Sequence, residues 1–415
     1  MSVGVSSMES SPHLTPDAGR LRIAVLAHNL RAAGGLTVGT NVISSLARVG
    51  DEHEYLLIVP EGVGYEDVQK PRRSECAYYR RRLSPLGPLW FEHHELPRSV
   101  HRFRPNVIWG LGNMGLRSPC AKQAILMHKP HYVYDSGAWK SRESFRFRAV
   151  NALGKRRLRL CLPVTQIVFC QTRTVCERFR NSFPFSGRVL LMPSAVSQSL
   201  LRGAPSKPPP VFDRLKGRYV LLCLTRYYAH KNLEILIELF LKHSDALRDV
   251  SVLVTVESSQ HPLAGRYLSR LHDHRLRDRI VNVGSVPPTE LAVYYANCNG
   301  FILPTLLETF GLPYLEAMRF GLPILTSDLD FAREVCGPAA RYFDPLNAQS
   351  IRGAILDLRD SPTLAGELSE AGHRRLREHF RSWDDIVADA LRELEGLAAS
   401  PVPGLRSGAA AAAMN

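Results

Sequence analysis

Apolar runs of strand length alternate with segments of helical periodicity along most of the chain. The first run, residues 21–27, is followed by a glycine-containing turn at 32–35 and then by apolar residues at helical spacing. Strand, glycine turn and helix form the opening unit of a parallel α/β layer. The same pattern predicts further strands at 55–59, 106–109, 124–127, 166–170 and 189–192.

The pattern breaks between residues 201 and 216, where prolines replace periodicity in the manner of a linker. Beyond the break, strands are predicted at 219–224, 250–256, 280–283, 300–303 and 323–326, and helices at 232–242, 289–297 and 313–320. Strands that alternate with helices indicate parallel sheets. The expected fold class is therefore α/β, with two doubly wound Rossmann-like domains. Because such sheets bind ligands beyond the carboxyl ends of their strands, we expect the domains to face each other across a cleft.

These boundaries divide the chain into two domains with connecting and terminal segments. We expect the first domain at 21–203, a linker at 204–217 and the second domain at 218–382. A helix at 383–400 is expected to cross back to the first domain. The polar segment 1–20 and the Gly/Ala-rich segment 401–415 are expected to be disordered tails.

Composition narrows the class of protein. No run approaches the ~18 consecutive apolar residues that a membrane span needs. The first 20 residues are polar where a signal peptide would be apolar, so we expect a cytoplasmic protein. The eight cysteines show no metal-ligand spacing. The excess of 53 Lys and Arg over 39 Asp and Glu leaves nucleic acid, anionic membrane and phosphorylated substrates open as partners.

The segment 303–317 carries the most informative chemistry. A predicted strand is followed by a loop that contains Glu308 and then by Pro313, which suits the first turn of a helix. The free amides of residues 309–312 would point out of the positive helix end, which suits a phosphate or sugar oxygen. Seven residues separate Glu308 from Glu316, and each carboxylate can accept two hydrogen bonds from a vicinal diol of a ribose or hexose.

This segment resembles the E-x7-E motif of the family-4 glycosyltransferases, which are retaining enzymes of the GT-B architecture. Arg226 and Lys231 resemble the strand-end Arg and nearby Lys of that family. The resemblance covers residues 219–347 and is weaker in the first domain, where Gly34 and Gly35 are among the residues that carry it.

The resemblance implies roles for these residues. Arg226 and Lys231 would neutralise the diphosphate of a nucleotide-sugar donor, since fixed cations stabilise the charge that develops on the leaving group. Glu316 would bind the nucleotide ribose, and Gly34 and Gly35 would let the backbone approach the diphosphate. The donor sugar and phosphate would be held by Glu308 and by the amides of Thr309, Phe310, Gly311 and Leu312. No metal and no cofactor is expected.

A histidine is expected in the same site. His128 follows the predicted strand 124–127, and the family resemblance suggests a histidine there that touches the donor sugar. His131 is the alternative, and both could be ordinary loop residues. We expect His128, which makes the catalytic set His128, Arg226, Lys231 and Glu308. Retaining members are thought to let the leaving phosphate help to deprotonate the acceptor, so no dedicated base is expected.

Three features of the sequence depart from this interpretation or imitate another one. Thr225 stands where the family usually has glycine, so the local loop is expected to differ. Residues 110–115 fit GxGxxG, but Pro119 and a further predicted strand follow where a dinucleotide site needs a helix. Asp328 and Asp330 imitate a metal-binding DxD motif, yet they lie inside the resemblance, and no metal role is expected.

The segment 140–160 is predicted to be a strongly basic helix. Eight Lys and Arg residues alternate with apolar residues, against a single acid, Glu143. Such a segment suits an anionic membrane surface, and a solvated helix face is an equal alternative. On the membrane interpretation the acceptor is lipid-linked. No aromatic-basic module of a known kind is visible, so nucleic acid is not an expected partner.

The expected function combines these inferences. The chain would be a retaining, metal-independent glycosyltransferase that moves a sugar from a nucleotide-diphosphate sugar to a glycan or lipid-linked acceptor. The first domain would take the acceptor and the second the donor, in cell-envelope or surface polysaccharide biosynthesis, in the cytoplasm or on the inner face of the membrane. Two alternatives remain: an enzyme of the same fold that cleaves or isomerises nucleotide sugars, and a catalytically silent nucleotide-sugar or glycan-binding module.

Overall fold

The computed structural model describes residues 19–80, 90–135, 137–201, 207–274 and 276–400. The segments expected to be disordered tails lie outside the described residues, apart from Gly19 and Arg20. Part of the expected linker, residues 204–206, also lies outside them.

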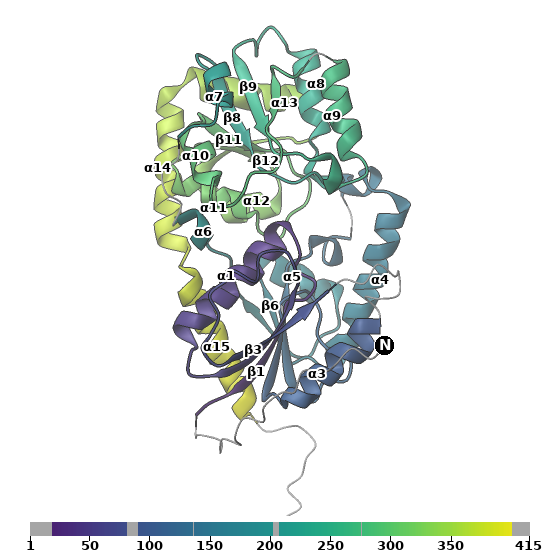
Figure 1. Ribbon diagram of the computed structural model, residues 1–415. Helices are drawn as coiled ribbons and strands as arrows, with labels where there is room; N and C mark the ends of the chain where they lie inside the picture. The colour runs from purple at the N-terminus through teal and green to yellow at the C-terminus, as the bar shows by residue number, and fades with distance from the viewer. Residues whose placement is uncertain (1–18, 81–89, 136, 202–206, 275, 401–415) are drawn as a thin grey trace, which may run out of the picture.

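Seven parallel strands form the first sheet, in the order β3-β2-β1-β4-β5-β6-β7. Its inner strands are apolar because helices cover both faces of the sheet (Figure 1). The strands are β1 (Arg22–Leu26), β2 (Glu54–Pro60), β3 (Ser74–Tyr79), β4 (Val107–Gly110), β5 (Lys122–Met127), β6 (Ile167–Cys170) and β7 (Arg188–Leu191). The sequence pattern does not predict β3, because this edge strand is mostly half-buried or exposed and lacks an apolar run.

The helices of this first half differ from expectation in two places. Gly34 and Gly35 lie in the first turn of α1 rather than in a separate turn. The basic segment is divided, because the Ser144 hydroxyl accepts a hydrogen bond from the Phe147 amide and thereby starts a new helix, α4. The helices are α1 (Ala33–Val49), α3 (Leu96–Phe103), α4 (Phe145–Cys161), α5 (Arg173–Ser182) and α6 (Gln198–Leu201), with shorter turns η1 (Phe91–Glu95), η2 (Pro130–Tyr132), η3 (Ala138–Arg142) and η4 (Leu162–Val164).

Six parallel strands form the second sheet, in the order β10-β9-β8-β11-β12-β13. They are β8 (Tyr219–Cys223), β9 (Val250–Val254), β10 (Ile280–Asn282), β11 (Gly300–Leu303), β12 (Ile324–Ser327) and β13 (Ala340–Phe343). Its helices and turns are α7 (Val211–Arg214), η5 (Ala229–Lys231), α8 (Glu234–Lys242), η6 (Ser258–Gln260), α9 (Ala264–Asp273), α10 (Leu291–Ala296), α11 (Leu312–Arg319), α12 (Asp330–Cys336), η7 (Gly337–Ala339), α13 (Ala348–Asp360) and α14 (Pro362–His379).

The last described helix, α15 (Trp383–Ala399), returns to the first sheet after the second is complete (Figure 1). It packs against α1 and against strands β4 and β5. Its inner face buries Trp383 and a row of aliphatic residues, and the Asp384 carboxylate accepts two hydrogen bonds from Arg48 of α1, at 2.6 and 2.9 Å. None of the described helices is long and apolar enough to cross a membrane.

The carboxyl ends of the two sheets meet across the middle of the molecule (Figure 1). In each sheet the strand order reverses, between β1 and β4 in the first and between β8 and β11 in the second. Loops on either side of such a reversal diverge and leave a crevice for a ligand. The fold class predicted from the sequence, two facing doubly wound sheets, is confirmed.

Candidate active site

The loop after β11 ends in a left-handed glycine. Gly311 has φ of 82°, and a Cβ on it would lie 2.5 Å from the Tyr314 ring, so this position requires glycine. The turn allows α11 to start at Leu312, with Pro313 in its first turn. Within the part of the chain that the structure describes, the amides of residues 309–312 donate no hydrogen bond. Free amides at the start of a helix suit an anion, so the binding role expected from the sequence stays a prediction that this geometry allows.

Thr309 joins this loop to the first sheet. Its hydroxyl donates to the side-chain oxygen of Gln171 at 2.8 Å and lies 3.2 Å from the carbonyl oxygen of His128. In return, the Thr172 hydroxyl donates to the Thr309 carbonyl oxygen at 3.2 Å. The loop between β11 and α11 in the second half is thus held against the strand ends of the first sheet.

Two basic residues lie at the end of β8. Lys231 forms a hydrogen-bonded ion pair with Glu308, so the structure brings together two of the expected site residues. The Nε of Arg226 is buried and has no hydrogen-bond partner among the described residues. A buried guanidinium nitrogen without a partner is costly, and a phosphate oxygen would satisfy it.

Glu316 is buried on α11 and is only partly satisfied. One carboxylate oxygen accepts a hydrogen bond from the Tyr295 hydroxyl at 2.7 Å. Burial raises the pKa of Glu316, although the Tyr295 hydrogen bond acts in the opposite direction. The other oxygen remains free to accept hydrogen bonds. One or two ribose hydroxyls that donate to it would offset the cost of burying the carboxylate charge.

The glycines of the first half lie beside this group. A Cβ on Gly34 would lie 3.8 Å from Leu312, and a Cβ on Gly35 would lie 3.5 Å from the ring of His128. The preceding residue, Ala33, has φ of 51°, a left-handed conformation that is strained for a residue with a side chain. The first turn of α1 therefore approaches both α11 and the expected histidine.

His128 is held in one orientation by backbone and amide groups. Its Nε2 lies 2.9 Å from the carbonyl oxygen of Leu111, and its own amide donates to Asn113 Oδ1 at 2.7 Å. Burial lowers the pKa of His128 to about 4, against the opposing effect of the Leu111 carbonyl. The ring is therefore neutral near pH 7. Nε2 also lies 3.3 Å from Asn113 Nδ2, but the shorter contact is with the Leu111 carbonyl oxygen, which only accepts. This favours the tautomer with the proton on Nε2, which leaves Nδ1 as an acceptor.

The alternative histidine occupies a different environment. His131 Nε2 lies 2.7 Å from Glu143 Oε1, and its ring packs edge-on against Trp139 and Phe147. The Glu143 carboxylate also accepts from His230 Nδ1, at 3.4 Å. Of the two histidines, His128 contacts the loop after β11, through its carbonyl oxygen, which lies 3.2 Å from the Thr309 hydroxyl.

Sequence reasoning missed the residues that position the site. Asn113, Gln171 and Tyr295 contact His128, Thr309 and Glu316 respectively, but each lies far from its partner along the chain. One sequence signal existed for Asn113, which belongs to the GxGxxG-like segment. In the structure it has φ of 66°, a left-handed conformation that Asn tolerates.

The DxD-like acids are engaged in ion pairs. Asp328 pairs with Arg333. Asp330 pairs with Arg178 and accepts a hydrogen bond from the Tyr134 hydroxyl at 3.0 Å, both in the first half of the chain. These carboxylates are thus neutralised by arginine, and Asp330 joins the two halves.

Two doubly wound parallel sheets that face each other across the middle of the molecule form the GT-B architecture. Sucrose-phosphate synthase from Thermosynechococcus elongatus has this fold in common with the chain, with a TM-score of 0.69 and 16% identity over 91% of this chain and 99% of that one. Residues 209–375 match the model of the glycosyl transferases group 1 family. The resemblance to the group 1 glycosyltransferases that the sequence predicted is thus confirmed over this segment.

Curated relatives match over a larger part of the chain. The serotype-specific mannosyltransferase WbdA of Escherichia coli is 24% identical over 367 residues, which is 84% of this chain and 41% of that protein. The O-antigen chain mannosyltransferase RfbU of Salmonella typhimurium is 27% identical over 195 residues, which is 47% of this chain and 53% of that protein. The matches therefore span about half of the length of these relatives or less.

Proposed function

We propose that the chain is a retaining, metal-independent glycosyltransferase that moves a sugar from a nucleotide-diphosphate sugar to a glycan or lipid-linked acceptor. One observation carries the proposal. Unpaired donors, namely the amides of residues 309–312 and the Nε of Arg226, gather with the buried acceptor Glu316 at the strand ends of the second sheet. Donors for a diphosphate beside an acceptor for ribose hydroxyls match the two chemically distinct parts of a nucleotide.

In the proposed transfer, the bond between the anomeric carbon and the phosphate oxygen breaks. A hydroxyl oxygen of the acceptor bonds to the same face of that carbon, and its proton goes to the leaving phosphate. Arg226, Lys231 and the helix-end amides stabilise the negative charge on the diphosphate. For this, Lys231 exchanges its ion pair with Glu308 for the phosphate, which frees Glu308 to accept hydrogen bonds from sugar hydroxyls. His128 Nδ1 supplies a further acceptor beside Gly35.

The transferred sugar is proposed to be mannose, in the assembly of an envelope or surface polysaccharide. This assignment is supported by the relatives, which are named as a serotype-specific and an O-antigen chain mannosyltransferase. Closely related hexoses differ in the orientation of one hydroxyl group. Comparing the binding of their nucleotide conjugates therefore tests the assignment to mannose.

A thermal-shift and calorimetry screen of UDP, GDP, ADP and their common sugar conjugates tests the donor site, in buffer with a chelator. A ligand that binds only the folded protein raises its melting temperature. We expect one nucleoside diphosphate to stabilise the wild type but not Glu316→Ala. Transfer of radiolabelled mannose to an extracted lipid-linked acceptor then tests the reaction. No response to any nucleotide would contradict the proposal, whereas binding without turnover would indicate a silent module.

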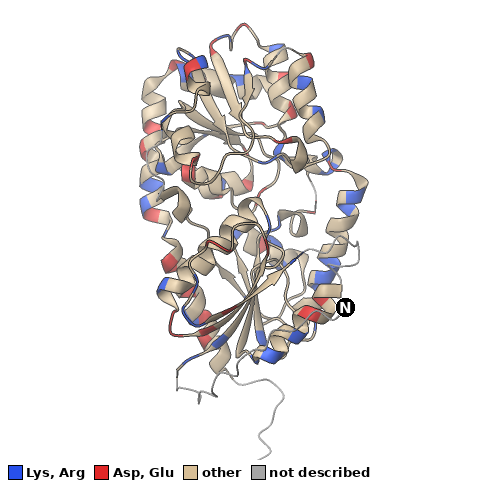
Figure 2. Ribbon diagram, in the orientation of Figure 1, with Lys and Arg blue, Asp and Glu red and all other residues tan. Residues whose placement is uncertain are grey.

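We further propose that α4 binds an anionic membrane surface on the inner face, where a lipid-linked acceptor would be presented. Lys and Arg residues recur along the ribbon of α4 (Figure 2), and the helix also exposes apolar side chains. Phe145 is 79% exposed, and Val150, Leu153 and Leu160 are also exposed. Arg146, Arg148, Arg156 and Arg159 share this solvent-facing surface. Basic residues attract anionic headgroups while the apolar ones enter the interface.

A further inference from the structure

A buried carboxylate lies between two histidines where the two halves of the molecule meet. Glu143 and His131 come from the first half, and His230 comes from η5 of the second. Glu143 Oε1 is 2.7 Å from His131 Nε2 and 3.4 Å from His230 Nδ1. The ligand atoms of the three residues all lie within 4.8 Å of one another. The side chain of Glu143 is 2% exposed.

This carboxylate lacks the partner that a buried charge needs. Among the described residues, neither a lysine nor an arginine forms an ion pair with Glu143, and its Oε2 is buried without a hydrogen-bond partner. Buried carboxylates are normally paired with a cation or bound to a metal. Lys231, next to His230 in the chain, is already paired with Glu308, and Lys129, which interacts electrostatically with Glu143, forms no ion pair with it among the described residues.

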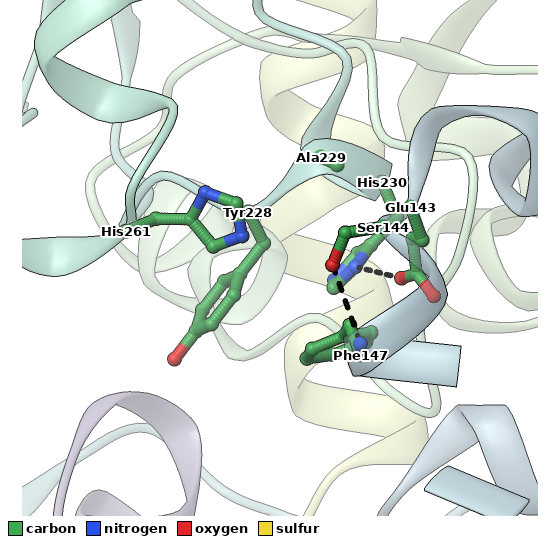
Figure 3. A pocket seen from close by; sticks show the side chains of 7 residues that line it. All are labelled: Glu143, Ser144, Phe147, Tyr228, Ala229, His230 and His261. Carbon is green, nitrogen blue, oxygen red and sulfur yellow. Dashed lines mark hydrogen bonds and ion pairs between the residues drawn. The ribbon is translucent and has the colours of Figure 1, made fainter. Parts of the chain in front are cut away.

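The donor set has the chemistry of a transition-metal site. Two imidazole nitrogens and a carboxylate oxygen form a three-residue set that Zn²⁺ accepts, with a fourth position left for water. Two of the three residues also border a hollow. Glu143 and His230 line a hollow between α4 and the second half, together with Ser144, Phe147, Tyr228, Ala229 and His261 (Figure 3).

We propose that His131, Glu143 and His230 bind one Zn²⁺ ion that joins the two halves of the molecule. His131 and His230 coordinate through the nitrogens that now contact Glu143, and their ring protons move to the opposite nitrogens. The ion serves to hold the halves together. The transfer proposed above needs no metal, so zinc binding and nucleotide binding are measured independently.

The test is a zinc titration of the full chain after chelation and desalting. We expect calorimetry and metal analysis to give one Zn²⁺ for each chain, and zinc to raise the melting temperature by roughly 5 °C. Glu143→Gln keeps the size of the side chain but removes its charge, and His131→Ala removes a ligand. Each should weaken zinc binding about 100-fold or more, since even outer partners of metal ligands contribute 10- to 100-fold.

Two controls separate this site from non-specific binding by histidine. His261→Ala changes a histidine of the same hollow that is outside the set, and it should bind zinc like the wild type. Nucleotide-induced stabilisation of Glu143→Gln shows that the variant is folded. Absence of stoichiometric zinc in the wild type, or unchanged affinity in both ligand variants, would overturn the proposal and leave the cluster as a hydrogen-bonded contact. Loss of zinc binding in His261→Ala alone would also contradict it.

Discussion

The imidazole of His128 is neutral and fixed, so its substitution should affect turnover more than donor affinity. The ring lies beside Gly35, where we propose that the sugar binds, whereas the proposed nucleotide-binding groups are on α11 and in the loop after β8. We expect His128→Ala to lower kcat about 100-fold, the scale for loss of one polar group that stabilises a transition state. The Kd for the nucleoside diphosphate, measured by calorimetry, should be nearly unchanged. Wild-type turnover in this variant would remove His128 from the site.

Glu316→Gln is expected to stabilise the free protein while weakening nucleotide binding. The folded-state pKa of Glu316 is raised above its ordinary value of 4.5 by burial. Its contribution to stability is therefore fully present below pH 4.5 and is lost as pH rises through the folded-state pKa. Above its folded-state pKa the wild type carries a buried charge that the amide lacks, so in that pH range the variant should melt at a higher temperature.

The same variant loses a charged acceptor for ribose hydroxyls, and its nucleotide affinity should fall roughly 10- to 100-fold. Thermal melts at pH 4.5 and pH 7.5, with and without nucleotide, check both effects. Equal melting temperatures of the two proteins at every pH would show that Glu316 is not destabilised by burial.

At this scale, the sequence pointed to the residues of the candidate site but not to those that position them. Glu308 and Glu316 share one strand–loop–helix unit, so their spacing carries the signal. Gln171 reaches Thr309 only because two sheets face each other, and the two residues are 138 positions apart. No local pattern encodes such a contact.

At the scale of elements, the strands with continuous apolar runs were predictable because both faces of a parallel sheet are buried. The edge strands β3 and β13 could not be predicted in this way, because they are partly exposed and contain no continuous apolar run. Ser144 was also overlooked. Its hydroxyl competes for a backbone amide and divides the basic segment into η3 and α4.

The exposed arginines of α4 give a test of membrane binding. Arg146→Ala with Arg148→Ala should weaken binding to vesicles with anionic lipid by about 2 kcal/mol, or roughly 30-fold, because each basic residue near such a surface contributes about 1 kcal/mol. Sedimentation with vesicles measures this loss. Arg374→Ala with Arg377→Ala is the matched control, since both are exposed on α14, on the other side of the molecule (Figure 1). An equal loss in both doubles would indicate attraction by net charge alone.

At the scale of the whole molecule, Glu334 of α12 links the two halves, and we expect this link to favour a closed arrangement. Its carboxylate accepts hydrogen bonds from the amides of Arg173 and Thr174, at 2.6 and 2.8 Å, at the start of α5. Glu334→Gln loses a charge-assisted contact, so the open form should increase roughly 10- to 100-fold relative to the closed form. We expect a larger radius of gyration in solution scattering without donor, reversed by nucleotide. Glu370→Gln on the exposed face of α14 should scatter like the wild type.

The return of α15 to the first sheet has a consequence for biosynthesis. The ribosome completes β1 to β7 early, but the surface of α1 that receives Trp383 and its neighbours stays uncovered until residues 383–399 have been made. The half that is translated first therefore finishes folding last. A nascent chain stalled within the second sheet exposes that apolar surface to chaperones, and its release depends on a helix encoded more than 180 codons downstream of β7.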